Sequence, residues 1–187
     1  MTTMFLLQRL KEAGRQKRKM VPCIFTLLNA YLGFLGILAA TSEAYGLVVI
    51  CILLAVCMDV LDGYSARALG AATMLGKELD SLSDAISFCL LPSILFYCWR
   101  GAWHPVISVA VAFAYLAAGL VRLARFNSTD QSSRTTFCGL PTPAGALICV
   151  FLIMCNAPTA QGICCVAFAM VGVALLMISS LPFPSFK

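Results

Sequence analysis

Long apolar stretches alternate with short polar ones along most of this chain. Six of the apolar stretches, at about 20 residues each, are long enough to cross a bilayer as helices. Their ranges in chain order are 21–40, 45–69, 77–99, 105–126, 139–156 and 163–181. The connections are short, except for the polar stretch NSTDQSSRTTFC at 127–138. The pattern predicts an all-α integral membrane protein with six transmembrane helices.

The first 20 residues have a different pattern. Basic residues follow the apolar group Phe5, Leu6, Leu7 and Leu10, and no small-residue cleavage site precedes the next apolar stretch. A signal peptide has the opposite order of charge and apolar residues. We expect residues 1–20 to form a short basic amphipathic helix on the membrane surface, or a disordered basic tail. Residues 21–187 would then form the membrane domain.

Composition agrees with a membrane protein. The chain is 61% hydrophobic and 11% charged, whereas soluble domains are about half apolar and about a quarter charged. The 10 cysteines include no CxxC pair, and His104 is the only histidine, so zinc-site spacing is absent. We expect the lipid bilayer as the surroundings of the chain and no nucleic-acid partner.

Basic residues indicate the orientation in the membrane. If the N-terminus is cytoplasmic, six spans place 12 of the 13 Lys and Arg residues on the cytoplasmic side and only Arg100 on the other. Such an excess of positive charge is typical of cytoplasmic loops. The pattern therefore predicts cytoplasmic N- and C-termini. It also places the polar ends of the second and third spans at the cytoplasmic face.

Acidic residues gather at those ends, in the segment DVLDGYSARALGAATMLGKELDSLSD at 59–84. Asp59 and Asp62 are spaced i, i+3, and Asp80 and Asp84 are spaced i, i+4, so each pair lies on one helix face. Two antiparallel helices would point the four carboxylates at one another. Ionisable residues within spans are functional candidates by default, because an unpaired charge there is costly.

Four facing carboxylates repel, so either some are protonated or divalent cations lie between them. Oxygen ligands suit Mg²⁺, Mn²⁺ or Ca²⁺. Gly63, Ala66 and Gly76 leave room for a ligand to approach the backbone, and Arg67 can pair with phosphate oxygens. Together these residues indicate a site for a metal-bound polyphosphate. A buried ion-pair cluster without chemistry and a cation channel or carrier are the alternatives.

The spacing D-x2-D-G-x2-A-R-x8-G-x3-D-x3-D, complete here from Asp59 to Asp84, resembles the signature of the CDP-alcohol phosphotransferases. The resemblance implies a six-helix membrane core, with a polar cavity open to the cytoplasm, that displaces CMP from a CDP-linked lipid. It implies two divalent ions, Mg²⁺, Mn²⁺ or Ca²⁺, held by Asp59, Asp62, Asp80 and Asp84. Asp84 would also be the general base.

The first span partly matches the family element P-N-x-x-T. Pro22 and Thr26 are in place, Cys23 stands where Asn is usual, and Asn29 follows one turn later. The resemblance implies that the following residues contact the CDP-lipid: Thr26, Asn29, Asp62, Gly63, Ala66, Arg67, Thr73 and Gly76.

Three further strings, GKELDSLSDAISF, LARFN and FCGLPTPAGA, and the ending ISSLPFPSFK are similar to the phosphatidylserine synthase branch of this family. The resemblance implies transfer of the phosphatidyl group of CDP-diacylglycerol to L-serine by direct displacement, and a homodimer. Members of the branch often carry additional helices beyond this point. Candidates for the serine pocket are Glu78, Arg122, Arg125, Asn127, Arg134, Gly139 and Pro141.

Three other functions remain open at this point. One is a CDP-alcohol phosphotransferase that uses glycerol phosphate or inositol phosphate, because arginines alone do not select serine. The others are an intramembrane prenyltransferase, which also uses paired aspartate motifs, and a cation carrier.

Overall fold

The computed structural model describes residues 2–70, 73–99, 104–128, 137–179 and 182–183. Its helices are α1 (Thr2–Thr41), α2 (Tyr45–Ala68), α3 (Met74–Asp84), the π-helix η1 (Ala85–Leu90), α4 (Leu91–Trp99), α5 (Pro105–Ser128), α6 (Thr142–Cys155) and α7 (Ala160–Ile178). Two short strands, β1 (Phe137–Cys138) and β2 (Pro182–Phe183), pair antiparallel.

Five segments are long and apolar enough to cross a membrane. They are Met20–Thr41, Tyr45–Ala68, Met74–Trp99, Pro105–Ser128 and Ala160–Ile178. Many large apolar side chains on them are exposed, as expected for surfaces that face lipid; Phe113 and Phe168 are examples. The chain is therefore a multi-pass membrane protein. The predicted fifth span differs, because α6 has only 14 residues.

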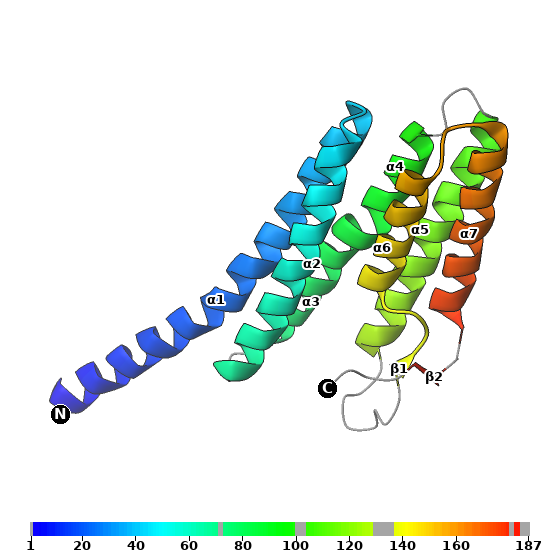
Figure 1. Cartoon of the computed structure of the whole chain (residues 1–187). Helices are drawn as coiled ribbons and strands as arrows, with labels where there is room; N and C mark the ends of the chain where they lie inside the picture. Colours follow the sequence, from blue (N-terminus) through cyan, green and yellow to red (C-terminus); the bar gives the residue numbers. More distant parts are fainter. Residues whose placement is uncertain (1, 71–72, 100–103, 129–136, 180–181, 184–187) are drawn as a thin grey trace.

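The N-terminal segment differs from the expected separate short helix. Residues 2–20 continue without a break into the first span as the single helix α1, whose N-terminal part extends beyond the rest of the bundle (Figure 1). Apart from Gly14, the basic segment consists mostly of good helix formers such as Gln, Lys, Arg, Leu and Ala. Pro22 also lies inside α1 without ending it. The side chains of residues 2–19 lie outside the described part, and so does the predicted amphipathic face.

Successive passes run in alternating directions (Figure 1). Helix α1 packs along α2 and α3, and α5 packs along α4 and α7. The end of α2, the start of α3, the end of α5 and the β1–β2 pair lie at one end of the bundle (Figure 1). That end carries the second half of α2 and the start of α3, so it contains the acidic segment.

The third pass is not a regular α-helix. Pro92 has no N–H, so the carbonyl of Phe88 four residues earlier loses its usual helical partner. The Tyr115 hydroxyl of α5 donates to that carbonyl over 3.1 Å. Just before Pro92, the backbone N–H of Leu91 bonds to Ile86, five residues back. A π-helical turn therefore follows Asp84 directly; such turns are frequent at functional sites.

Two glycines allow neighbouring helices to approach this turn closely. A Cβ added at Gly33 of α1 would meet Ser87, and one added at Gly119 of α5 would meet Cys89. The π-helical turn is thus packed tightly between α1 and α5. The position of Asp84, the residue immediately before the turn, depends on both helices.

Candidate metal and substrate site

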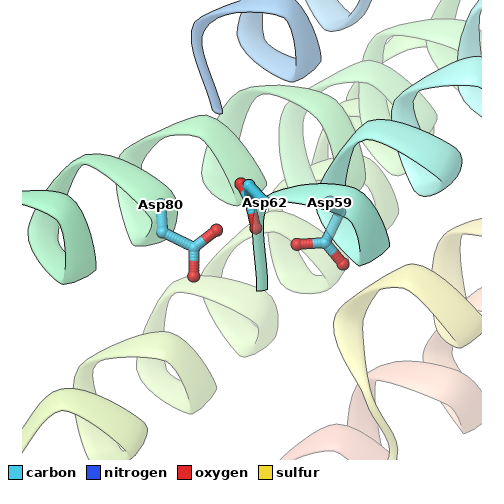
Figure 2. A group of neighbouring side chains, drawn as sticks. All are labelled: Asp59, Asp62 and Asp80. Carbon is cyan, nitrogen blue, oxygen red and sulfur yellow. The ribbon is translucent and has the colours of Figure 1, made fainter. Parts of the chain in front are cut away.

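Three carboxylates meet where α2 and α3 lie side by side. Asp59 and Asp62 come from α2 and Asp80 from α3, and one oxygen of each lies within 4.8 Å of the others. Figure 2 shows the three side chains directed toward a common region, with Asp62 between the other two. Asp62 is buried, and Asp59 and Asp80 are half-buried. The antiparallel pairing expected from the i, i+3 spacing thus brings acids from two helices together.

Asp84 lies one helical turn after Asp80, at the end of α3, and is buried. Its side chain is in contact with that of Asp59, and it accepts a hydrogen bond from the Asn29 amide over 3.4 Å. Asp84 is not part of the group of three converging oxygens. The four acids therefore divide into a three-carboxylate cluster and one neighbouring carboxylate held by α1.

Helix α1 forms a third wall of the site through Thr26. The Thr26 hydroxyl lies 3.0 Å from both an Asp62 oxygen and the Pro22 carbonyl, and its one proton can bond only one of them at a time. The Ser83 hydroxyl donates to the Thr26 carbonyl over 2.8 Å. Thr26 thus connects α1 both to the Asp62 carboxylate of α2 and to the end of α3.

The donor set suits a hard divalent cation. All three converging ligands are carboxylate oxygens, the type that Mg²⁺ and Mn²⁺ prefer. One Asp80 oxygen is buried and has no hydrogen-bond partner among the described residues. Two nearby cationic side chains donate to backbone carbonyls rather than to these carboxylates. Arg67 donates to the Gly63 carbonyl and Lys77 to the Asn127 carbonyl, both over 3.1 Å. Repelling carboxylates with an unused buried oxygen fit a site that a cation completes.

Small residues leave one side of the cluster open. A Cβ added at Gly63 would meet nothing within 4 Å, so neither packing nor backbone geometry requires glycine there. Ala66, one turn later, is half-buried. Thr73 begins α3 as its N-cap and accepts from the Gly76 N–H over 3.0 Å. That cap sets the residue at which α3 starts, and hence the side of the helix on which Asp80 lies.

The two candidate arginines of α5 have different surroundings. Arg122 is half-buried, lies close enough to Asp84 to interact electrostatically, and donates to the Thr142 hydroxyl over 3.4 Å. Its Nε is buried without a partner in the described part of the chain. Arg125 is exposed and donates to the Ile178 carbonyl over 2.9 Å, at the end of α7. Arg122 therefore lies within electrostatic range of Asp84, whereas Arg125 caps the end of α7.

Glu78 and Asn127 belong to a polar network between α3 and α5. The Asn127 amide donates to Glu78 over 3.3 Å and to the Ser81 hydroxyl over 2.9 Å. The backbone carbonyl of Asn127 accepts from the Lys77 ammonium over 3.1 Å. These contacts join the start of α3 to the end of α5.

Gly139 and Pro141 lie before α6. Gly139 is buried with φ +83°, and a Cβ there would press on the Met177 carbonyl. The Leu140 N–H donates to the Leu176 carbonyl over 3.2 Å. The turn therefore packs against the end of α7. Arg134 lies outside the described residues.

Comparison with known proteins identifies the family. The family model described as CDP-alcohol phosphatidyltransferase matches residues 19–179. This chain belongs to the CDP-alcohol phosphatidyltransferase family. The match confirms the resemblance drawn from the aspartate spacing, and it includes every element that forms the site, from α1 to α7.

Several relatives align with most of the chain. A CDP-diacylglycerol–serine O-phosphatidyltransferase of Bacillus subtilis is 34% identical over 169 residues, covering 89% of this chain and 91% of the relative. One of Helicobacter pylori is 31% identical, covering 89% of this chain and 72% of the relative. An archaetidylserine synthase of Methanothermobacter thermautotrophicus is 35% identical, covering 88% and 69%.

The family signature does not include several side chains that shape this site. Asn29, Ser83, Ser87 and Tyr115 hold the aspartates or the π-helical turn through hydrogen bonds. The sequence does carry a signal for an irregular third pass: serines and Pro92 lie within its apolar stretch, and they indicate a helix stabilised by hydrogen bonds to neighbouring helices. They could not indicate which neighbouring helix supplies each partner.

Proposed function

We propose that this chain transfers the phosphatidyl group of CDP-diacylglycerol to the hydroxyl of L-serine, producing phosphatidylserine and CMP. The observation that carries the proposal is the convergence of carboxylates from α2 and α3 within 4.8 Å, inside a chain of this family. All three relatives described above have serine in their names, whereas the lipid part is phosphatidyl in two and archaetidyl in the third. The comparisons therefore support serine as the acceptor more strongly than they support a particular lipid tail.

Asp59, Asp62 and Asp80 would hold two divalent ions, with Asp84 as a further ligand. The ions would be Mg²⁺ or Mn²⁺, or alternatively Ca²⁺. Bound ions of this kind neutralise phosphate charge and stabilise the leaving CMP. The open backbone at Gly63 would admit the diphosphate. Arg67, which is exposed beside it, would donate to the phosphate oxygens.

Asp84 would act as the general base. It would take the proton of the serine hydroxyl while the serine oxygen attacks the phosphorus that bears the diacylglycerol. The bond between that phosphorus and the CMP oxygen then breaks, and CMP leaves with the electron pair. One phosphorus–oxygen bond forms and one breaks, so no covalent intermediate with the enzyme is needed.

Arg122 would bind the serine carboxylate. Its buried Nε has no partner among the described residues, and it lies within electrostatic range of Asp84, where the serine hydroxyl must react. A guanidinium matches a carboxylate with two parallel hydrogen bonds. Arg125, Asn127, Glu78 and the turn at Gly139 and Pro141 would support the pocket from helix ends.

Replacing Arg122 by glutamine tests this role. The variant should raise the KM for serine about tenfold or more, because a charge-assisted hydrogen bond contributes about 1.5–3 kcal/mol. The affinity for CDP should change less than twofold. A steady-state titration of serine, with calorimetric CDP binding alongside, measures both; an unchanged KM for serine contradicts the assignment.

Gly63→Ala tests the open backbone. An added methyl meets no protein atom and favours the helix by about 1 kcal/mol, so thermal stability in detergent should not fall. The affinity for CDP should fall about tenfold, because the methyl would occupy the space of the diphosphate. Gly172→Ala is the matched control, since its added Cβ also meets nothing within 4 Å and α7 is remote from the cluster. Equal CDP affinity in both variants would argue against this approach path.

For the membrane arrangement, we propose six passes with both termini and the site at the cytoplasmic face. The turn at residues 139–141 would add to the 14 residues of α6 to complete its pass. We also propose a homodimer.

An acceptor panel tests the function itself. Purified protein with CDP-diacylglycerol and Mg²⁺ or Mn²⁺ should release CMP when L-serine is present. Glycerol 3-phosphate and inositol phosphate should give no release above the level without acceptor. Release with glycerol 3-phosphate but not with serine contradicts the proposal, as does release that persists in excess EDTA.

A further inference from the structure

Asn29 of α1 is completely buried, with 0% of its surface exposed. Its side-chain amide lies 3.4 Å from an Asp84 oxygen, and its backbone carbonyl accepts from the Ser87 hydroxyl over 2.9 Å. Its side-chain oxygen is buried and has no hydrogen-bond partner among the described residues. One residue of α1 therefore contacts both Asp84 and the π-helical turn that follows it.

Stability does not explain an asparagine at this position. A buried carbonyl oxygen without a partner costs about 1–3 kcal/mol, and an amide–carboxylate contact at 3.4 Å is long. Leucine has a similar volume and would avoid that cost in an apolar helix. The Asn29 side chain therefore costs stability, yet it contacts Asp84. This combination indicates that Asn29 has a role in the reaction.

We infer that Asn29 is a positioning residue that sets the direction of the Asp84 carboxylate. A carboxylate accepts but cannot donate, so the amide N–H holds one Asp84 oxygen and leaves the other directed elsewhere. This inference rests on the proposed function, in which Asp84 takes the proton of the acceptor hydroxyl.

The backbone supports the same role. Ser87 is tied to α1 through the Asn29 carbonyl, and the neighbouring Phe88 carbonyl is tied to α5 through the Tyr115 hydroxyl. Hydrogen bonds from opposite sides thus hold two consecutive residues of the turn after Asp84. The turn cannot rotate about the helix axis without breaking one of them, so the direction of Asp84 is maintained.

This role differs from a contact with the CDP-lipid, which the family resemblance implies for Asn29. A nucleotide contact stabilises the bound substrate, so its loss raises the KM for CDP-diacylglycerol. A positioning residue acts on the chemical step, so its loss lowers kcat. The two roles therefore predict different kinetic parameters.

The test is Asn29→Leu in the full-length protein, measured by serine-dependent CMP release and thermal unfolding in detergent. We expect kcat to fall 10–100-fold, as is typical when the partner of a functional ligand is removed. Both KM values should stay within about twofold of wild type, and the unfolding temperature should be equal or higher. If Asn29→Leu does not fold, Asn29→Ser, whose side chain is too short to reach Asp84, should show the same loss of kcat.

Ser108→Ala is the control. It removes a hydrogen bond from a buried hydroxyl to the His104 carbonyl near the start of α5, away from the π-helical turn, and should retain wild-type kcat. An unchanged kcat in Asn29→Leu, a raised KM for CDP-diacylglycerol alone, or an equal loss in Ser108→Ala would overturn the inference. A wild-type protein that releases no CMP with serine would overturn the proposed function first.

Discussion

Asp84→Asn should bind CDP almost as tightly as the wild type and lose turnover by about 10²–10⁴-fold, the usual contribution of a general base. The substitution keeps the size of the side chain and an oxygen that can accept from Asn29. It removes the carboxylate that would take the proton of the serine hydroxyl. Because Asp84 is not one of the three converging ligands, the main metal site should remain.

Two measurements separate these effects. Calorimetric titration with CDP and Mn²⁺ reports the binding site, and the rate of CMP release at saturating serine reports the chemical step. Glu43→Gln is the matched control, because it makes the same acid-to-amide change at an exposed position in the α1–α2 turn, at the opposite end of the bundle. Near-normal turnover of Asp84→Asn would show that another group is the base.

Asp80→Asn should lose metal binding, CDP binding and turnover together. Asp80 is the one ligand of the three-carboxylate cluster that comes from α3, so the substitution leaves the two acids of α2 without an opposite partner. Metal ions stabilise the transferring phosphoryl group by several kcal/mol, so we expect turnover to fall by about 10³-fold or more.

Thermal unfolding with and without Mn²⁺ isolates the role of Asp80. A ligand that binds only the folded state raises the unfolding temperature, so Mn²⁺ should stabilise the wild type. Without metal, Asp80→Asn should be at least as stable as the wild type, because one of the repelling carboxylates is removed. With Mn²⁺, the variant should show little further increase. An equal Mn²⁺ effect in both proteins would contradict the assigned ligand.

Hydropathy predicted five of the six expected spans well, because lipid selects apolar residues over the whole length of a helix; the expected fifth span corresponds only to the 14 residues of α6. The expected ranges 45–69 and 105–126 correspond to Tyr45–Ala68 and Pro105–Ser128. The i, i+3 spacing placed Asp59 and Asp62 on one face of α2 for an equally local reason: residues three or four apart share a helix face. Asp80 joins them from α3, as expected for two antiparallel helices joined by a short connection, whereas Asp84 is not in the group of three converging oxygens.

Contacts between distant segments could not be predicted in the same way. Asn29 and Asp84 are separated by 55 positions, and whether they meet depends on how closely α1 approaches the π-helical turn. Arg122 and Arg125 are only three residues apart on α5. Their surroundings differ because the end of α7 lies beside Arg125 and the start of α6 beside Arg122. The charge pattern of the sequence shows that basic residues lie at a helix end. It does not show which group each basic side chain contacts.

Electron paramagnetic resonance of Mn²⁺ tests the central claim, that the converging carboxylates bind divalent ions that in turn hold the nucleotide. Free Mn²⁺ gives a strong signal in solution that weakens on binding. We predict tight binding of two Mn²⁺ per wild-type chain in the presence of CDP, and a loss of that binding in Asp80→Asn but not in Glu43→Gln. Failure of the wild type to bind Mn²⁺, or undiminished binding by Asp80→Asn, would contradict the account.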